Sequence, residues 1–149
     1  MGNIIITKTD TDLDFDVAYF GIEIRNKVQP STSTFGFVGS INMYIYEGRI
    51  KLQEIATDII KFSLNPVEKY CLKFEDTVLG TDGILLLEFS AHSTGHVKIK
   101  VNAKTGLNTE NVEECTFNFQ SELGLIEKFG KNLKTFSEQG ALQEVSLHE

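Results

Sequence analysis

Apolar and polar residues alternate without a break between His96 and Lys104, and the apolar set shares one face: Val97, Ile99, Val101 and Ala103. A period of two with lysines on the other face predicts a half-buried strand of an antiparallel sheet. A second alternation follows the turn residues at 104–109 and puts three residues on one face: Cys115, Phe117 and Phe119. The pattern therefore predicts two strands paired as a hairpin.

The period changes at Ser121. Apolar residues then recur at spacings of three and four, at Ile126, Phe129, Leu133 and Phe136, with lysines on the opposite side. This spacing predicts an amphipathic helix over about 121–137. Ser121 suits the N-cap position, because its hydroxyl can accept a hydrogen bond from the first turn. We expect the apolar stripe to pack on the inner face of the preceding strands.

The rest of the chain repeats this order of strands followed by a helix. Alternating segments predict strands near 3–8, 15–24, 35–45, 70–74 and 85–89, with a phase slip near Gly21 that suggests a bulge or bend. A second stripe, at Leu52, Ile55, Ala56, Ile59 and Ile60, predicts a helix over about 50–63. We therefore expect one α+β domain over 1–149, with a mainly antiparallel sheet of about seven strands and two amphipathic helices.

Composition and charge narrow the classes of partner. The chain has a formal net charge of −7, so generic affinity for nucleic acid or an anionic membrane is not expected. No apolar run approaches the length of a membrane span, and residues 1–6 lack the basic and long apolar regions of a signal peptide. We therefore expect a cytoplasmic protein, for which a cationic partner is electrostatically easier than an anionic one.

Four aspartates near the N-terminus are the sharpest local signal: Asp10, Asp12, Asp14 and Asp16. An EF-hand loop that began at Asp12 would need glycine where Val17 stands, so we expect no calcium site here. The alternation of these aspartates with apolar residues favours a solvated strand face. They are also the best candidate for an acidic partner-binding patch, and both interpretations stay open.

No catalytic or metal-binding motif is present. His92 and His96 have a spacing that binds zinc on a helix, but Ser93, Thr94 and Gly95 between them predict a turn. Cys71 and Cys115 lack metal-ligand spacing, and strand phase places Cys115 inward and Cys71 outward, which disfavours a disulfide. No nucleophile elbow or phosphate-binding loop occurs. We expect no enzyme activity, no cofactor and no metal.

Several segments between about Ile41 and Phe136 resemble the WapI-type immunity protein family. The resemblance is carried by the helix over 48–62 and by short motifs at 70–75, 85–89, 94–99 and 116–120, the last leading into the helix rich in leucine and phenylalanine. Two features differ: the chain has no tryptophan near the first helix, and Gln120-Ser121-Glu122-Leu123 stands where an aspartate-glutamine pair is typical.

The resemblance implies a small cytoplasmic bacterial protein that binds a cognate toxin and blocks it without catalysis. An acidic surface suits a basic toxin, because complementary charge speeds association. The alternative is a small-ligand-binding protein or enzyme with a pocket between sheet and helices, which the many phenylalanines could line. A third possibility is an assembly subunit that associates through strand edges.

Overall fold

Seven strands and two helices follow one another in the order predicted from the sequence, and a short eighth strand is added at the end. The structure, a computed structural model, describes residues 2–8, 17–27, 36–46, 48–66, 69–75, 83–106, 110–138 and 144–148. Its elements are β1 (Gly2–Lys8), β2 (Val17–Lys27), β3 (Gly36–Tyr46), α1 (Gly48–Leu64), β4 (Tyr70–Glu75), β5 (Ile84–Ala91), β6 (His96–Thr105), β7 (Glu113–Glu122), α2 (Leu123–Phe136) and β8 (Glu144–Ser146).

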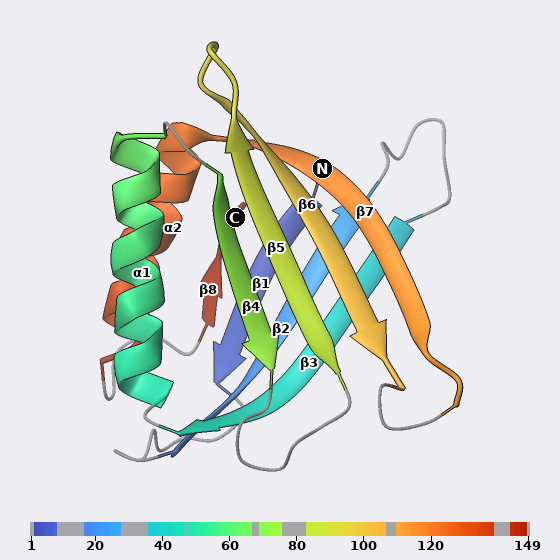
Figure 1. The fold of residues 1–149 in the computed structure, drawn as a ribbon. Coiled ribbons are helices and arrows are strands. Elements are labelled where there is room, and N and C mark those ends of the chain that lie inside the picture. The colour runs from blue at the N-terminus through green and yellow to red at the C-terminus, as the bar shows by residue number, and fades with distance from the viewer. Residues whose placement is uncertain are drawn as a thin grey trace.

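The strands form two antiparallel sheets of four strands each, which lie face to face (Figure 1). The terminal sheet has the order β3-β2-β1-β8, and the meander sheet has the order β4-β5-β6-β7. The predicted α+β class is confirmed. The strands are divided between two sheets instead of one, and β8 is additional, because its 3 residues are too few to show a period in the sequence.

The bulge expected near Gly21 is absent. Gly21 lies opposite Thr7 of β1 and Asn42 of β3, and the register on both sides of β2 continues through it without a slip. Strand β2 is paired with β1 along one edge and with β3 along the other. A bulge would insert one extra residue into β2 and shift this pairing. No shift occurs, so the change of hydrophobic phase at Gly21 involves no extra residue.

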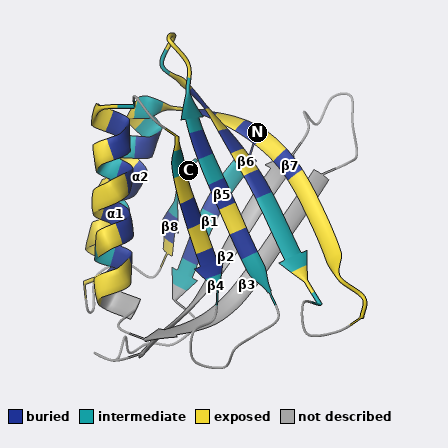
Figure 2. Ribbon diagram, viewed as in Figure 1, coloured by how far each residue is buried: buried dark blue, intermediate teal, exposed yellow. Residues whose placement is uncertain are grey.

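The inner face of the meander sheet forms much of the core. Burial alternates along its strands, as Figure 2 shows, and the buried residues are Leu72, Phe74, Leu85, Leu87, Phe89, Val97, Ile99, Val101, Phe117 and Phe119. Ile4 and Ile6 of β1 and Val145 of β8 join the same core from the terminal sheet. The alternation predicted for β6 is thus confirmed. The predicted inner face of β7 is only partly buried, because Cys115 is exposed although it shares the phase of Phe117.

The two helices lie side by side along the edges formed by β4 and β8 (Figure 1). Their predicted apolar stripes are buried, at Leu52, Ile55, Ala56 and Ile59 in α1 and at Ile126, Phe129, Leu133 and Phe136 in α2, except that Ile60 of the α1 stripe is half-buried. The main partner of α2 is α1, with smaller contacts to β7 and β8, instead of the face of the preceding strands. Gly130 permits this approach, because a Cβ there would lie 2.7 Å from Ile60 Cγ1 and 3.1 Å from Ile59 Cγ2.

Ser121 is not the N-cap of α2. The capping residue is Glu122, which makes no side-chain cap hydrogen bond. Ser121 is the penultimate residue of β7 and is buried, and its hydroxyl forms a hydrogen bond of 3.0 Å with Nε2 of His148. The Ser121 hydroxyl therefore bonds to a residue 27 positions away in the sequence instead of capping the helix.

His148 and Asn3 tie the end of the chain to its beginning. His148 Nδ1 donates to the carbonyl oxygen of Gly2. The Asn3 amide donates to the His148 carbonyl at 2.6 Å, and its oxygen accepts from the His148 main-chain N–H at 2.7 Å. Ser146 Oγ also accepts from Asn3 at 2.8 Å. Because His148 also reaches Ser121, this cluster links the terminal sheet to the meander sheet.

Gly130→Val should destabilise the protein by about 1–3 kcal/mol, because the added atoms overpack the contact between α1 and α2. The measurement is the free energy of unfolding in urea. Gly124→Ala in the same helix is the matched control. A Cβ at Gly124 meets nothing within 4 Å, so the control should gain up to about 1 kcal/mol from helix propensity. Equal stability of Gly130→Val and the wild type would contradict this account of the helix contact.

Asn3→Ala should lower the free energy of unfolding by roughly 1–3 kcal/mol, since it leaves the partly buried main-chain N–H of residue 148 without its acceptor, while the carbonyl of that residue keeps the Ser146 hydroxyl as a donor. Thr7→Ala on the same strand is the control, because its hydroxyl makes only an exposed bond of 3.4 Å to Glu144. Thermal unfolding of both variants decides the matter: similar melting temperatures would show that the cluster around His148 contributes little.

Candidate functional site

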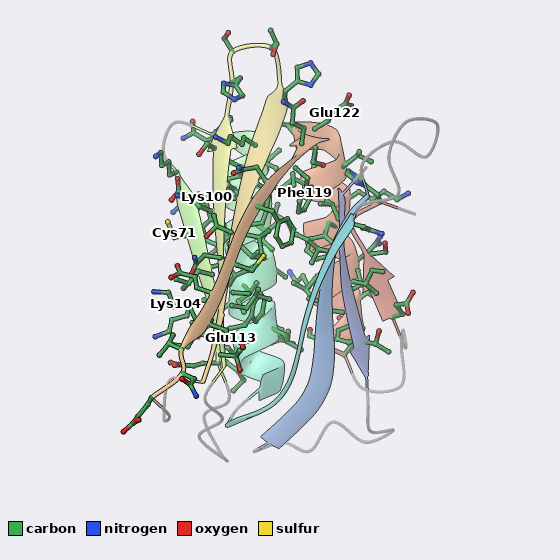
Figure 3. All side chains as sticks on the ribbon, turned by 90° about the vertical axis from the view of Figure 1, so that its right-hand side faces the viewer. Cys71, Lys100, Lys104, Glu113, Phe119 and Glu122 are labelled. Carbon is green, nitrogen blue, oxygen red and sulfur yellow. The ribbon has the colours of Figure 1, made fainter. Side chains whose placement is uncertain are left out.

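The outer face of the meander sheet is turned away from both helices and from the terminal sheet. Antiparallel pairing aligns its side chains in rows across the strands, such as Cys71, Glu88 and Lys100, or Lys73, Leu86 and Asn102. In Figure 3, Cys71, Lys100 and Lys104 lie on this side of the sheet, whereas Phe119 lies on the other. The face is defined here by the outward residues of β4 to β7.

A shallow depression of about 450 Å³ lies at the centre of this outer face. It is lined by Cys71, Leu72, Lys73, Leu86, Leu87, Glu88, Lys100, Asn102, Lys104, Glu114 and Thr116. Leu86 is the exposed apolar residue among them, with 37% of its surface accessible. Ile84 lies two residues away on the same face of β5 and is half-buried. An apolar centre is thus surrounded by charged and polar side chains.

The charges on the outer face are nearly balanced, in contrast to the chain as a whole. The face carries Lys69, Lys73, Lys98, Lys100 and Lys104 together with Glu75, Glu88, Glu114 and Glu122. Because the chain has a net charge of −7, its excess negative charge lies elsewhere. This face therefore does not repel an anionic surface as the remainder of the chain does.

The glutamates of the outer face are engaged more fully than the lysines of β6. Glu88 pairs with Lys69 at 3.1 Å, and Glu75 pairs with Lys73 at 3.3 Å. The Asn102 amide donates to Glu114 at 2.6 Å and to Thr116 at 2.8 Å. Within the part of the chain that the structure describes, Lys98, Lys100 and Lys104 have no carboxylate within 4.0 Å. They form a row of donors along one strand.

A second depression, of about 420 Å³, lies on the exposed face of α1 between Ile50 and Asp58. Its lining residues span about two turns of one helix, and Ile50 at its end is 50% exposed. Because the described residues that line it all belong to one helix, their side chains do not converge on a common point. It is therefore the weaker candidate for binding.

The residues singled out from the sequence do not assemble into a catalytic or metal site. Asp10, Asp12, Asp14 and Asp16 lie outside the described residues, so the acidic patch stays a prediction. His92 and His96 flank the tight turn between β5 and β6, where His92 N–H donates to the His96 carbonyl at 2.8 Å, and both are exposed. Among the described residues, no three histidine, cysteine, aspartate or glutamate side chains group as metal ligands.

The two thiols are free and exposed. Cys71 lies on the outer face of β4 as predicted, whereas Cys115 lies on the inner face of β7, at the opposite edge of the sheet. Strand phase predicts the face on which a residue lies, but not how far the opposing sheet extends over that face. Cys115 is therefore exposed although it lies on the inner face. Leu86 is the feature that sequence reasoning missed, since it stands inside the apolar run Ile84-Leu85-Leu86-Leu87.

Tyr70 has the one clearly shifted pKa in the described part of the chain. Burial at the seam between β4 and α1 raises the pKa of its phenol far above the ordinary value, and the negative charge of Asp58 adds to the effect. Its ring packs against Phe62 and Phe89, with centroids 6.3 Å and 5.7 Å away. Shifted groups often mark active sites, but these neighbours are aromatic core residues, so the shift has a structural cause.

Comparisons of the chain with models of protein families, with curated proteins and with solved structures gave no match. The described part of the chain contains no helix that is both long and apolar enough to cross a membrane. The choice of a binding surface therefore rests on the geometry of the described residues.

The stability of the wild type relative to Tyr70→Phe should fall as pH rises above about 10. The folded phenol keeps its proton while the unfolded phenol loses it, so unfolding releases a proton and is favoured by high pH. Below that pH the difference between the two proteins should be constant. Urea unfolding at several pH values measures this, and a pH-independent difference up to pH of about 11 would contradict the assigned burial.

Proposed function

We propose that this protein is a non-catalytic binding module that contacts a protein partner through the outer face of the meander sheet. The observation that carries the proposal is this open sheet face, where Leu86 forms an apolar centre within a polar rim and Ile84 adjoins it on the same face of β5. Protein interfaces have this arrangement, with apolar residues at the core and polar residues around them. The lysines of β6 supply donors for carbonyl or carboxylate oxygens of the partner.

The shape and charge of the face favour a protein over other ligands. A shallow depression on one side of a sheet cannot enclose a small molecule, which normally requires a concave site that buries most of its surface. Lysines and glutamates alternate across the face, whereas binding to nucleic acid depends on an excess of positive charge. An interspersed pattern of both signs instead gives orientation and specificity to a protein contact.

The resemblance to WapI-type immunity proteins suggests the kind of partner. On that basis we propose that the partner is a bacterial toxin domain and that binding neutralises it in the cytoplasm by occluding its functional site. A basic toxin fits the net charge of −7, which would attract it before the specific contacts form. Asp10, Asp12, Asp14 and Asp16 remain the predicted acidic patch for this step.

Leu86→Asp should weaken binding to the partner at least tenfold, because it places a carboxylate at the apolar centre of the interface. The test is co-expression with the protein encoded beside this one, followed by affinity capture, a measurement of Kd and a growth assay for toxicity. Ile50→Asp is the matched control, since Ile50 is an exposed apolar residue on α1 outside the proposed interface.

The proposal expects capture and relief of toxicity with the wild type and with Ile50→Asp, and loss of both with Leu86→Asp. Circular dichroism is the control that tests whether the two variants are folded. A complex that survives Leu86→Asp unchanged would exclude the outer face. Absence of capture and of relief by the wild type would exclude the immunity-type function.

A further inference from the structure

The first half of β7 is exposed on both of its faces. Residues 110–116 form an unbroken run of exposed positions, although Glu113 to Thr116 are paired with β6. In the second half of the same strand, Phe117, Phe119 and Ser121 are buried on the inner side. Figure 3 looks onto this edge of the meander sheet, with Glu113 at one end of β7 and Glu122 at the other.

The two halves differ because the terminal sheet reaches only the second half. Gly2 packs so closely on Phe119 that a Cβ at position 2 would lie 2.1 Å from Phe119 Cγ. Cys115, four residues earlier on the same face, is exposed. The sheets therefore meet near Phe119, and the strand from Glu113 to Thr116 is not covered.

The main-chain groups of this half-strand point in a known direction. Leu123 N–H donates to the Gly95 carbonyl at 3.1 Å, which fixes the phase of hydrogen bonding between β6 and β7. In an antiparallel pair, residues alternate between bonding to the neighbour and facing away from it. Residues 113 and 115 therefore bond to β6, and Glu114 and Thr116 direct N–H and C=O away from it. In the described part of the chain, β7 pairs with no strand on that side.

The charge of this edge selects its occupant. Strand β7 contains three glutamates and neither lysine nor arginine, and Glu110 precedes it. Glu114 is held by Asn102 and lies opposite Lys104, and Glu122 lies at the far end of β7, so Glu113 and Glu110 are the carboxylates left beside the uncovered half of the strand. Glutamates along an edge disfavour pairing with a second copy of the same strand, because like charges would oppose each other.

We propose that an extended segment of the partner, carrying lysine or arginine, adds to the meander sheet as a fifth strand along β7. Its main chain hydrogen-bonds to Glu114 and Thr116, and its cationic side chains lie against Glu113 and Glu110. Strand addition of this kind takes affinity from the main chain and specificity from alternate side chains. The inference rests on the proposed function, and it names the element through which a basic partner is held.

Thr116→Pro tests the edge directly. Proline removes the outward N–H of residue 116, which makes no bond to β6, and edge strands tolerate proline with this orientation. Thr116→Val is the matched control, because it removes the same hydroxyl contact to Asn102 but keeps the N–H. The probe is a synthetic peptide of alternating lysine and valine, with an alternating glutamate and valine peptide for comparison. The readout is amide hydrogen exchange by NMR.

The lysine peptide should slow exchange of the Glu114 amide at least tenfold in the wild type and in Thr116→Val, and should have little effect in Thr116→Pro. Glu113→Lys should reduce the protection, and the glutamate peptide should give none. Absence of protection by the lysine peptide, or equal protection in the proline and valine variants, would overturn the inference.

The inference and the proposed function can fail separately. If the co-expressed partner binds the wild type, loses affinity for Leu86→Asp and binds Thr116→Pro as well as Thr116→Val, strand addition is wrong and the outer face stands. If the lysine peptide protects Glu114 but no partner is captured or neutralised, β7 accepts strands and the immunity-type function is wrong.

Discussion

The two sheets are held at one end by a contact that only glycine permits. At position 2 the main chain of β1 lies directly against the ring of Phe119, and any side chain there would occupy the same space. His148 fixes this arrangement, because its two ring nitrogens contact the Gly2 carbonyl and the Ser121 hydroxyl on opposite sheets. The same contact explains why the core is closed near Phe119 and why β7 is open at its beginning. The position of the binding edge is thus a consequence of where the sheets meet.

Local periodicity predicted the elements but not their long-range partners. The stripes of α1 and α2 and the alternation of β6 follow from burial on one side, which a period of 3.6 or 2 records directly. Ser121 was assigned to the wrong role because its partner, His148, is distant in sequence. The division into two sheets was missed because strand order depends on contacts between the ends of the chain, where β8 pairs with β1.

The candidate site was predicted only in part for the same reason. The lysines at 98, 100 and 104 were placed correctly on a wet face, since they alternate with buried residues. Leu86 is in phase with Glu88 and so belongs to the outward face, but its position in a depression depends on the neighbouring strands, which periodicity does not record. The accessibility of Glu114 and Thr116 depends on β7 being an edge strand, which is a property of the topology and not of the residues.

The face and the edge of the meander sheet can serve one partner with different interactions. Side chains on the outer face distinguish partners by shape and charge, whereas the main chain of β7 offers hydrogen bonds that any extended segment can use. Main-chain bonding alone would be unselective and would invite self-association. The glutamates at 110 and 113 provide the missing selectivity, because they favour a cationic strand and oppose an identical one. The net negative charge of the chain acts in the same direction at longer range, since it raises the rate of encounter with a basic partner.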